Sequence, residues 1–219
     1  MEFWLATTDH ISDKVLFRKV SDFITAMNYV AVIKCITGVR ILAFILMSNH
    51  VHFVFECTKE EARDFMNRFK TLYGRYFAKE YGISNVLRLN NVDIRPVYME
   101  DDSLKRAIAY VLMNSVYARL CVFANEYPWG SGGVYFNNIG INGVRIGSLS
   151  KRAQERLFKT WTSVNPEWIL TDAGFISPSC YVSWKFVESL YGSPSRLKYF
   201  LDTSSKARNQ WPDAPGFSD

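Results

Sequence analysis

The residues that decide the fold are two adjacent hydrophobic segments, Val39-Arg-Ile-Leu-Ala-Phe-Ile-Leu-Met47 and His50-Val-His-Phe-Val-Phe-Glu56. The first is almost continuously apolar, which is typical of a strand buried on both faces. The second alternates with a period of two, as a strand does when its two faces lie in different environments. Only Ser48-Asn49 separates them, so the stretch predicts a hairpin in the middle of a sheet.

The flanking sequence supplies two further strands and three helices. Pro96 removes a backbone donor and confines its strand to a sheet edge. In chain order we expect a strand at Phe3–Asp9, a helix at Val20–Thr37, a helix at 59–81, a strand at Asp93–Met99 and a helix at Leu104–Phe123. With the central hairpin this order is βαββαβ plus one helix, which predicts an α+β fold with a ferredoxin-like antiparallel sheet and an added helix.

A turn-rich segment, Glu126–Gly133, separates a first unit, residues 1–136, from a mostly helical C-terminal extension, residues 137–219. Short helices are expected at Ser150–Trp161, Tyr181–Tyr191 and Ser195–Leu201, and the last dozen residues read as a loose tail. The extension suits an accessory helical bundle or a lid packed on the sheet. The pattern does not decide between the two.

Composition narrows the class of protein. The chain has 219 residues, 48% of them hydrophobic, and a net charge of +5, which argues against wholesale disorder. Its four cysteines form no CxxC pair, so we expect reduced thiols and a cytoplasmic location. The longest clean apolar run, Ile41–Met47, is far short of the roughly 20 residues that a membrane span needs. A modest basic excess permits a polyanionic partner without demanding one.

Two sets of polar residues stand out on the expected elements. His50 and His52 are two apart on a strand and therefore project from one face, where two imidazoles can bind a metal ion. Ordinary sheet residues are the alternative interpretation. On the last helix of the first unit Tyr110, Asn114 and Tyr117 share one face at i, i+4 and i+7. The alternative there is that both tyrosines lie at the core edge and that Asn114 bonds locally.

Three motifs resemble those of one enzyme family. Met47-Ser-Asn-His-Val-His-Phe-Val-Phe-Glu56 resembles the metal-binding strand of the HUH single-tyrosine transposases. Ala109–Leu120 resembles the nucleophile-bearing helix of that family, and Glu126-Tyr-Pro-Trp-Gly-Ser131 resembles its Tyr-Pro-Trp-Ser-Ser turn. The likeness spans roughly residues 1–136 and is greatest to the REP-associated tyrosine transposases.

The resemblance implies a catalytic domain over 1–136 that cuts and rejoins single-stranded DNA carrying a hairpin. Tyr110 would be the nucleophile, with Tyr117 as the fallback, and the product would be a 5′-phosphotyrosine. It also implies His50, His52 and Asn114 as ligands of Mg²⁺ or Mn²⁺. Four positions depart from the family pattern: Ser48 and Ser115 replace prolines, Tyr117 replaces an arginine and Arg119 replaces a glycine.

DNA contacts have weaker candidates. A stripe of basic residues on the helix 59–81 suits phosphate binding, although a solvated helix face explains the stripe equally well. Arg106, one turn before Tyr110, is a further candidate. Tyr73 and Trp129 are candidates for base stacking. The basic candidates are Arg68, Arg75, Lys79 and Arg106.

Two other function classes stay open beside the enzyme. One is a nonenzymatic module that binds single-stranded nucleic acid on its sheet. The other is a zinc hydrolase that uses His50, His52 and His10, since zinc accepts three histidines and water. The active unit is either a single chain or a homodimer.

Overall fold

A four-stranded antiparallel sheet in the order β2-β3-β1-β4 forms the centre of the molecule. The structure is a computed structural model and describes residues 1–8, 15–84, 87, 91–137 and 140–207. The strands of the sheet are β1 (Phe3–Thr8), β2 (Arg40–Leu46), β3 (Val51–Glu56) and β4 (Val92–Val97). The helices are α1 (Val20–Thr37), α2 (Lys59–Tyr81), α3 (Ser103–Tyr117), α4 (Lys151–Phe158), α5 (Trp184–Tyr191) and α6 (Pro194–Ala207). This strand order confirms the predicted ferredoxin-like sheet, with Pro96 in an edge strand.

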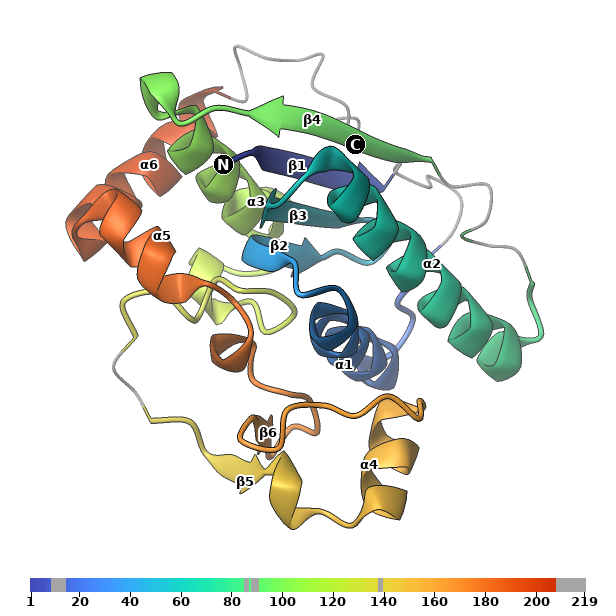
Figure 1. Cartoon of the computed structure of the whole chain (residues 1–219). Helices are drawn as coiled ribbons and strands as arrows, with labels where there is room; N and C mark the ends of the chain where they lie inside the picture. The colour runs from blue at the N-terminus through green and yellow to red at the C-terminus, as the bar shows by residue number, and fades with distance from the viewer. Residues whose placement is uncertain (9–14, 85–86, 88–90, 138–139, 208–219) are drawn as a thin grey trace.

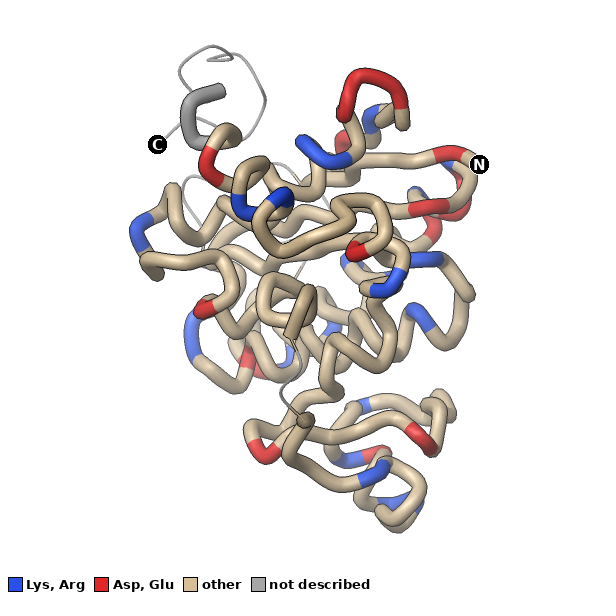
Figure 2. The backbone as a smooth tube through the Cα atoms, turned by 90° about the vertical axis from the view of Figure 1, so that its left-hand side faces the viewer, with Lys and Arg blue, Asp and Glu red and all other residues tan. Residues whose placement is uncertain are grey.

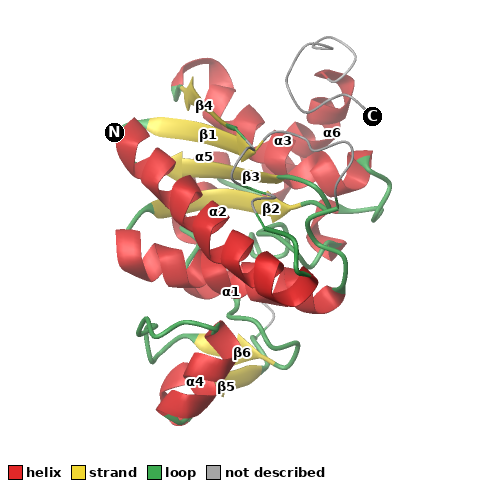
Figure 3. Cartoon of the chain, turned by 90° about the vertical axis from the view of Figure 1, so that its right-hand side faces the viewer, coloured by secondary structure: helices red, strands yellow, loops and turns green. Residues whose placement is uncertain are grey.

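The sheet lies between two layers of helices. Helices α1 and α2 cover one face, and α3 covers the other with α5 and α6 beside it (Figures 1 and 3). Phe53 and Phe55 of β3 pack on Phe65 of α2, with ring centroids 5.3 and 4.9 Å apart. Because side chains alternate along a strand, His52 points to the α3 face. The period-two pattern therefore predicted the two faces of β3 correctly.

The outer edge of β2 is covered by backbone from two distant segments. Ser131 and Phe44 exchange hydrogen bonds, and the Leu46 N–H donates to the Trp129 carbonyl at 2.8 Å. Near the other end of β2, the Ser183 N–H donates to the Ile41 carbonyl at 2.8 Å. An uncovered edge strand is a template for pairing with other chains. The Tyr-Pro-Trp-Gly-Ser turn and the start of α5 therefore close this side of the sheet.

Helix α2 begins and ends as its sequence predicts, whereas α3 does not. Thr58 and Glu61 form a capping box at the start of α2, and Gly82 ends that helix with a φ of 69°. Helix α3 was expected to reach Phe123 but ends at Tyr117. Arg119 takes a φ of 57° there, and the Leu120 N–H donates to the Ser115 carbonyl. These features are those of a Schellman motif, which terminates the helix.

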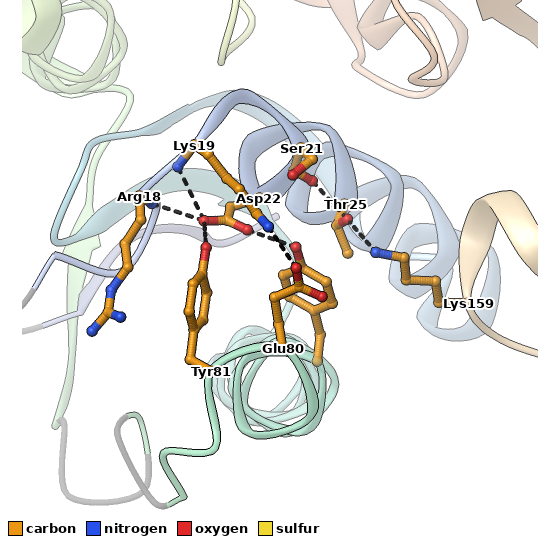
Figure 4. A network of polar contacts seen from close by, with 9 residues as sticks. Arg18, Lys19, Ser21, Asp22, Thr25, Glu80, Tyr81 and Lys159 are labelled. Carbon is orange, nitrogen blue, oxygen red and sulfur yellow. Dashed lines mark hydrogen bonds and ion pairs between the residues drawn. The ribbon is translucent and has the colours of Figure 1, made fainter.

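A buried carboxylate joins the start of α1 to the end of α2 (Figure 4). Asp22 accepts hydrogen bonds from the Tyr76 and Tyr81 hydroxyls, both at 2.6 Å, and from the backbone N–H groups of Arg18 and Lys19. Burial tends to raise the pKa of Asp22, but these hydrogen bonds outweigh it and hold the pKa below its usual value. Burial and the bond to Asp22 raise the pKa of Tyr81 to about 12. The network therefore links two core helices through one buried, charged side chain.

The C-terminal part packs along the first unit in two places. A two-stranded antiparallel sheet, β5 (Gly143–Arg145) with β6 (Ile169–Thr171), and α4 lie beside α1, where Asn28 bonds to Gly174 and Ile176. Helices α5 and α6 lie beside α3 (Figure 1). The extension therefore contains strands as well as helices. The sequence did not predict these strands, because three residues are too short to show a period.

The boundaries of the C-terminal helices differ from those expected. Helix α4 is shorter, and Ser150 caps it by accepting the Ala153 N–H. The expected helix at Tyr181–Tyr191 begins at Trp184, after a 3-10 turn at Pro178–Cys180, and α6 runs to Ala207 rather than Leu201. The expected tail, and Asp9 of the first strand, lie outside the described residues.

Among the described residues, one helix, α1, is long and apolar enough to span a membrane by composition. It is largely buried, and Met27, Val30 and Ile33 are completely covered in the core. An interior helix passes the same composition test. Here α1 packs with α2 against one face of the sheet.

Candidate active site

His52 of β3, His50 immediately before that strand and a tyrosine of α3 meet on one face of the sheet. The ring centroids of His50 and His52 are 4.7 Å apart, with the rings nearly perpendicular. The ring of Tyr110 lies edge-on to His52, with centroids 5.4 Å apart. Both imidazoles are buried, and Tyr110 is half-buried. The structure therefore brings together the histidine pair and the tyrosine that the motifs singled out separately.

Each imidazole is held from its Nδ1 side. His52 Nδ1 lies 2.9 Å from Thr7 Oγ1, on the neighbouring strand β1, and His50 Nδ1 lies 2.7 Å from Asn49 Oδ1. A ring nitrogen that donates to an oxygen leaves the opposite nitrogen with a lone pair. The Nε2 atoms of both rings are buried. Metal-ligating histidines have this arrangement, in which one nitrogen binds an oxygen and the other binds the cation.

Asn114 lies one helical turn after Tyr110 and is buried. Its Nδ2 donates to the Tyr110 carbonyl at 2.8 Å, with a longer contact to the Val111 carbonyl. Local bonding by Asn114, one of the interpretations left open by the sequence, is thus present and involves the amide nitrogen. The amide oxygen is the atom of this side chain that suits a cation. Two imidazole nitrogens and one amide oxygen are a donor set that fits a divalent ion.

Tyr117, the fallback nucleophile, has a different setting. Its hydroxyl donates to Ser204 Oγ of α6 at 3.1 Å, so it contributes to the packing of α6 on α3. Tyr110 is the tyrosine of the stripe whose ring contacts His52.

The basic candidates separate into two groups. Arg68, Arg75 and Lys79 are exposed on α2, which covers the opposite face of the sheet from Tyr110, and Arg68 pairs with Asp64 at 2.7 Å. The structure therefore does not bring this stripe to the histidines. Arg106 is exposed on α3, one turn before Tyr110. Figure 2 shows basic and acidic positions interspersed along the backbone in that view.

The two aromatic candidates for base stacking differ in burial. Tyr73 is completely buried and its hydroxyl donates to the Leu16 carbonyl at 2.6 Å. Trp129 stacks on Phe23, with ring centroids 4.9 Å apart, and contacts Phe175. The expectation for Tyr73 was wrong because its ring fills the core, whereas Trp129 is partly buried and stays a prediction.

His10, the third histidine of the alternative zinc site, lies outside the described residues. Within the described part of the chain, no three His, Cys, Asp or Glu side chains gather as a metal-binding group. Asn is not one of these four residue types, so this finding does not bear on a site made by two histidines and Asn114.

Sequence reasoning missed the two side chains that hold the imidazoles. Asn49 adjoins His50 in the chain, and its place in the Ser48-Asn49 connection was the available signal. Thr7 lies 45 positions before His52 and faces it across the β1–β3 ladder. That pairing depends on strand register, which a single sequence does not reveal.

Comparisons with known proteins agree with the class that the fold and site suggest. Residues 10–89 match the sequence model of the family described as "Transposase IS200 like". The matched region contains both histidines and ends before Tyr110. The match agrees with the resemblance to tyrosine transposases over the part of the chain that holds the two histidines.

One solved structure that is similar to this chain is that of a REP-associated tyrosine transposase bound to a REP hairpin. The sequence identity is 11% and the TM-score is 0.44, and the alignment covers 59% of this chain and 76% of that chain. No curated protein matches the chain.

Proposed function

We propose that this protein is a metal-dependent transposase that cleaves and rejoins single-stranded DNA through Tyr110, at sites flanked by hairpins. The observation that carries the proposal is the contact between Tyr110 of α3 and His52 of β3, on the face that also holds His50. The hairpin substrate rests on the motif resemblance to REP-associated tyrosine transposases. We propose a cytoplasmic location on the absence of paired cysteines from the sequence.

Tyr110 carries the bond exchange in this proposal. Its phenolic oxygen attacks the scissile phosphorus, an Oη–P bond forms, and the P–O3′ bond breaks. The departing oxygen takes a proton and becomes a free 3′-OH, while the 5′ side stays linked to the protein as a phosphotyrosine. A phenoxide is also an acceptable leaving group, so a 3′-OH can reverse the step without another energy source.

His50, His52 and Asn114 would hold the divalent ion, which we propose to be Mg²⁺ or Mn²⁺. When bound there, such an ion supplies positive charge to the nonbridging oxygens of the phosphate. The chain itself contributes the placement of the ligands: β3 and the residue just before it carry the two histidines, and α3 carries the third ligand one turn from the nucleophile. Coupling the ligand and the nucleophile on one helix sets their separation.

Arg106 is the proposed DNA contact nearest the nucleophile, because it is exposed on α3 one turn before Tyr110. A guanidinium there can bind a phosphate of the attacked strand. Arg68, Arg75 and Lys79 stay a prediction as DNA contacts, since they lie on the other side of the sheet.

The test is covalent capture of labelled single-stranded hairpin DNA with Mn²⁺. Tyr110→Phe should abolish the denaturant-resistant adduct, and Tyr117→Phe, the matched control on the same helix face, should retain it. Chelation of the metal should abolish the adduct with the wild-type protein and with Tyr117→Phe. Full adduct formation by Tyr110→Phe would refute the proposal. Metal-independent binding with no adduct from the wild-type protein would favour the nonenzymatic binding module.

A further inference from the structure

Thr7 is the residue that holds His52 in place. Its Oγ1 lies 2.9 Å from His52 Nδ1, and the two residues are direct partners in the antiparallel ladder between β1 and β3. Facing residues of such a ladder point to the same side of the sheet. Thr7 therefore reaches the imidazole from the side opposite to the buried Nε2 atom.

The partner of His50 indicates in which direction the Thr7 hydrogen bond runs. His50 Nδ1 lies 2.7 Å from Asn49 Oδ1, and a carbonyl-type oxygen only accepts hydrogen bonds. His50 therefore carries its proton on Nδ1. A threonine hydroxyl either donates or accepts. If it accepts from His52 in the same way, both rings present an Nε2 lone pair to one space.

Resting on the proposed function, we propose that Thr7 is a positioning residue, which accepts the Nδ1 proton of His52 and so directs the Nε2 lone pair of that ring toward the divalent cation. Thr7 itself touches neither the cation nor the DNA. Partners of this kind fix the tautomer and orientation of ligating histidines, and their loss typically costs about 10–100-fold in metal affinity.

Nitrogen NMR of the metal-free protein, at a pH where the imidazoles are neutral, tests the tautomer. The wild-type protein should show His52 protonated on Nδ1, as should Thr7→Ser, which keeps the hydroxyl. Thr7→Val, which is nearly isosteric, should lose this preference. Thr8→Val is the matched control: the Thr8 hydroxyl accepts the Val51 N–H at 3.0 Å, so its loss should leave the His52 tautomer unchanged.

Mn²⁺ binding, followed by the free-ion spin-resonance signal, is the second readout. Thr7→Val should weaken Mn²⁺ binding about 10–100-fold, and Thr7→Ser should restore it to within a few-fold of the wild-type affinity. An unchanged tautomer in Thr7→Val, or a wild-type His52 protonated on Nε2, would overturn the role of Thr7. A wild-type protein with the expected tautomer but no affinity for Mn²⁺ would instead contradict the metal site of the proposed function.

Discussion

Arg119 occupies a backbone position that suits glycine. Its φ of 57° lies in the left-handed region, where a Cβ costs about 1 kcal/mol or more. We expect Arg119→Gly to raise the free energy of unfolding by about 0.5–1 kcal/mol in urea titrations. Arg119→Ala, which also removes the exposed side chain but keeps a Cβ, should show no such gain. Equal stabilities of the glycine and alanine variants would show that the conformation carries no penalty.

This residue also shows why one helix end was misjudged. Glycine usually marks the left-handed residue that ends a helix, as Gly82 does for α2. Arg119 adopts the same conformation without that signal, so the apolar periodicity of Val116 to Phe123 predicted six residues of helix that are absent. The resemblance contained a hint, since the transposase motif has glycine at this position.

At the scale of single elements, Gly130 sits against the outer edge of β2, in the turn that covers it. A Cβ added there would lie 2.7 Å from the Phe44 carbonyl oxygen and 3.2 Å from the Ile45 Cα. We expect Gly130→Ala to lower the free energy of unfolding by about 1–3 kcal/mol, because backbone must move to admit it. Gly74→Ala is the control, since open space surrounds that position within α2. Gly74→Ala should raise the free energy of unfolding by about 0.5–1 kcal/mol. An unchanged stability of Gly130→Ala would show that the backbone of β2 moves to admit the Cβ without a penalty.

The hydrogen-bond network of Asp22 between α1 and α2 should affect the stability of the protein at acidic pH. Because the pKa of Asp22 is lower in the folded protein than in the unfolded chain, its charge stabilises the fold fully above the unfolded pKa. That contribution is lost as the pH falls through the folded pKa, which lies below the usual value of an aspartate.

Asp22→Asn should therefore cost about 2–3 kcal/mol at neutral pH. It should also flatten the pH dependence of unfolding, measured by urea titration, in the acid range. Asp64→Asn, at an exposed site paired with Arg68, should change stability by less than about 1 kcal/mol. An acid profile identical to that of the wild-type protein would contradict the assigned role of Asp22.

Elements with a strong period were predictable, and contacts set by register were not. The alternation of β3 and the three-and-four spacing of α2 predicted both elements and their buried faces. The three-residue strands β5 and β6 are too short for any period. In the site, the spacing of His50 and His52 and the motif around Tyr110 predicted the residues that meet. Thr7 could not be found, because its partner is chosen by the pairing of β1 with β3.

At the scale of the whole molecule, the C-terminal part holds α3 in its place. The Tyr191 hydroxyl donates to the Lys105 carbonyl at 2.6 Å, and Tyr117 bonds to Ser204 of α6. Helix α3 is thus packed between the sheet and α6 of the same chain. The division into residues 1–136 and 137–219 stays a prediction, and so does a homodimer.

This packing leads us to expect that each chain uses its own tyrosine. A mixture of Tyr110→Phe with His52→Ala, each inactive alone, should form no adduct with single-stranded DNA. Exchange of α3 between two chains would instead restore activity in the mixture, to about a quarter of the composite sites if subunits pair at random. The molar mass in solution, measured by light scattering, shows whether copies associate under the same conditions.

The most direct test of the account is to locate the covalent bond. After reaction of the wild-type protein with single-stranded hairpin DNA and Mn²⁺, nuclease digestion and peptide mass spectrometry should find a 5′-linked nucleotide on the Tyr110 hydroxyl. A nucleotide on Tyr117 or on another residue, or a 3′ linkage, would contradict the central claim that Tyr110, beside His52, is the nucleophile.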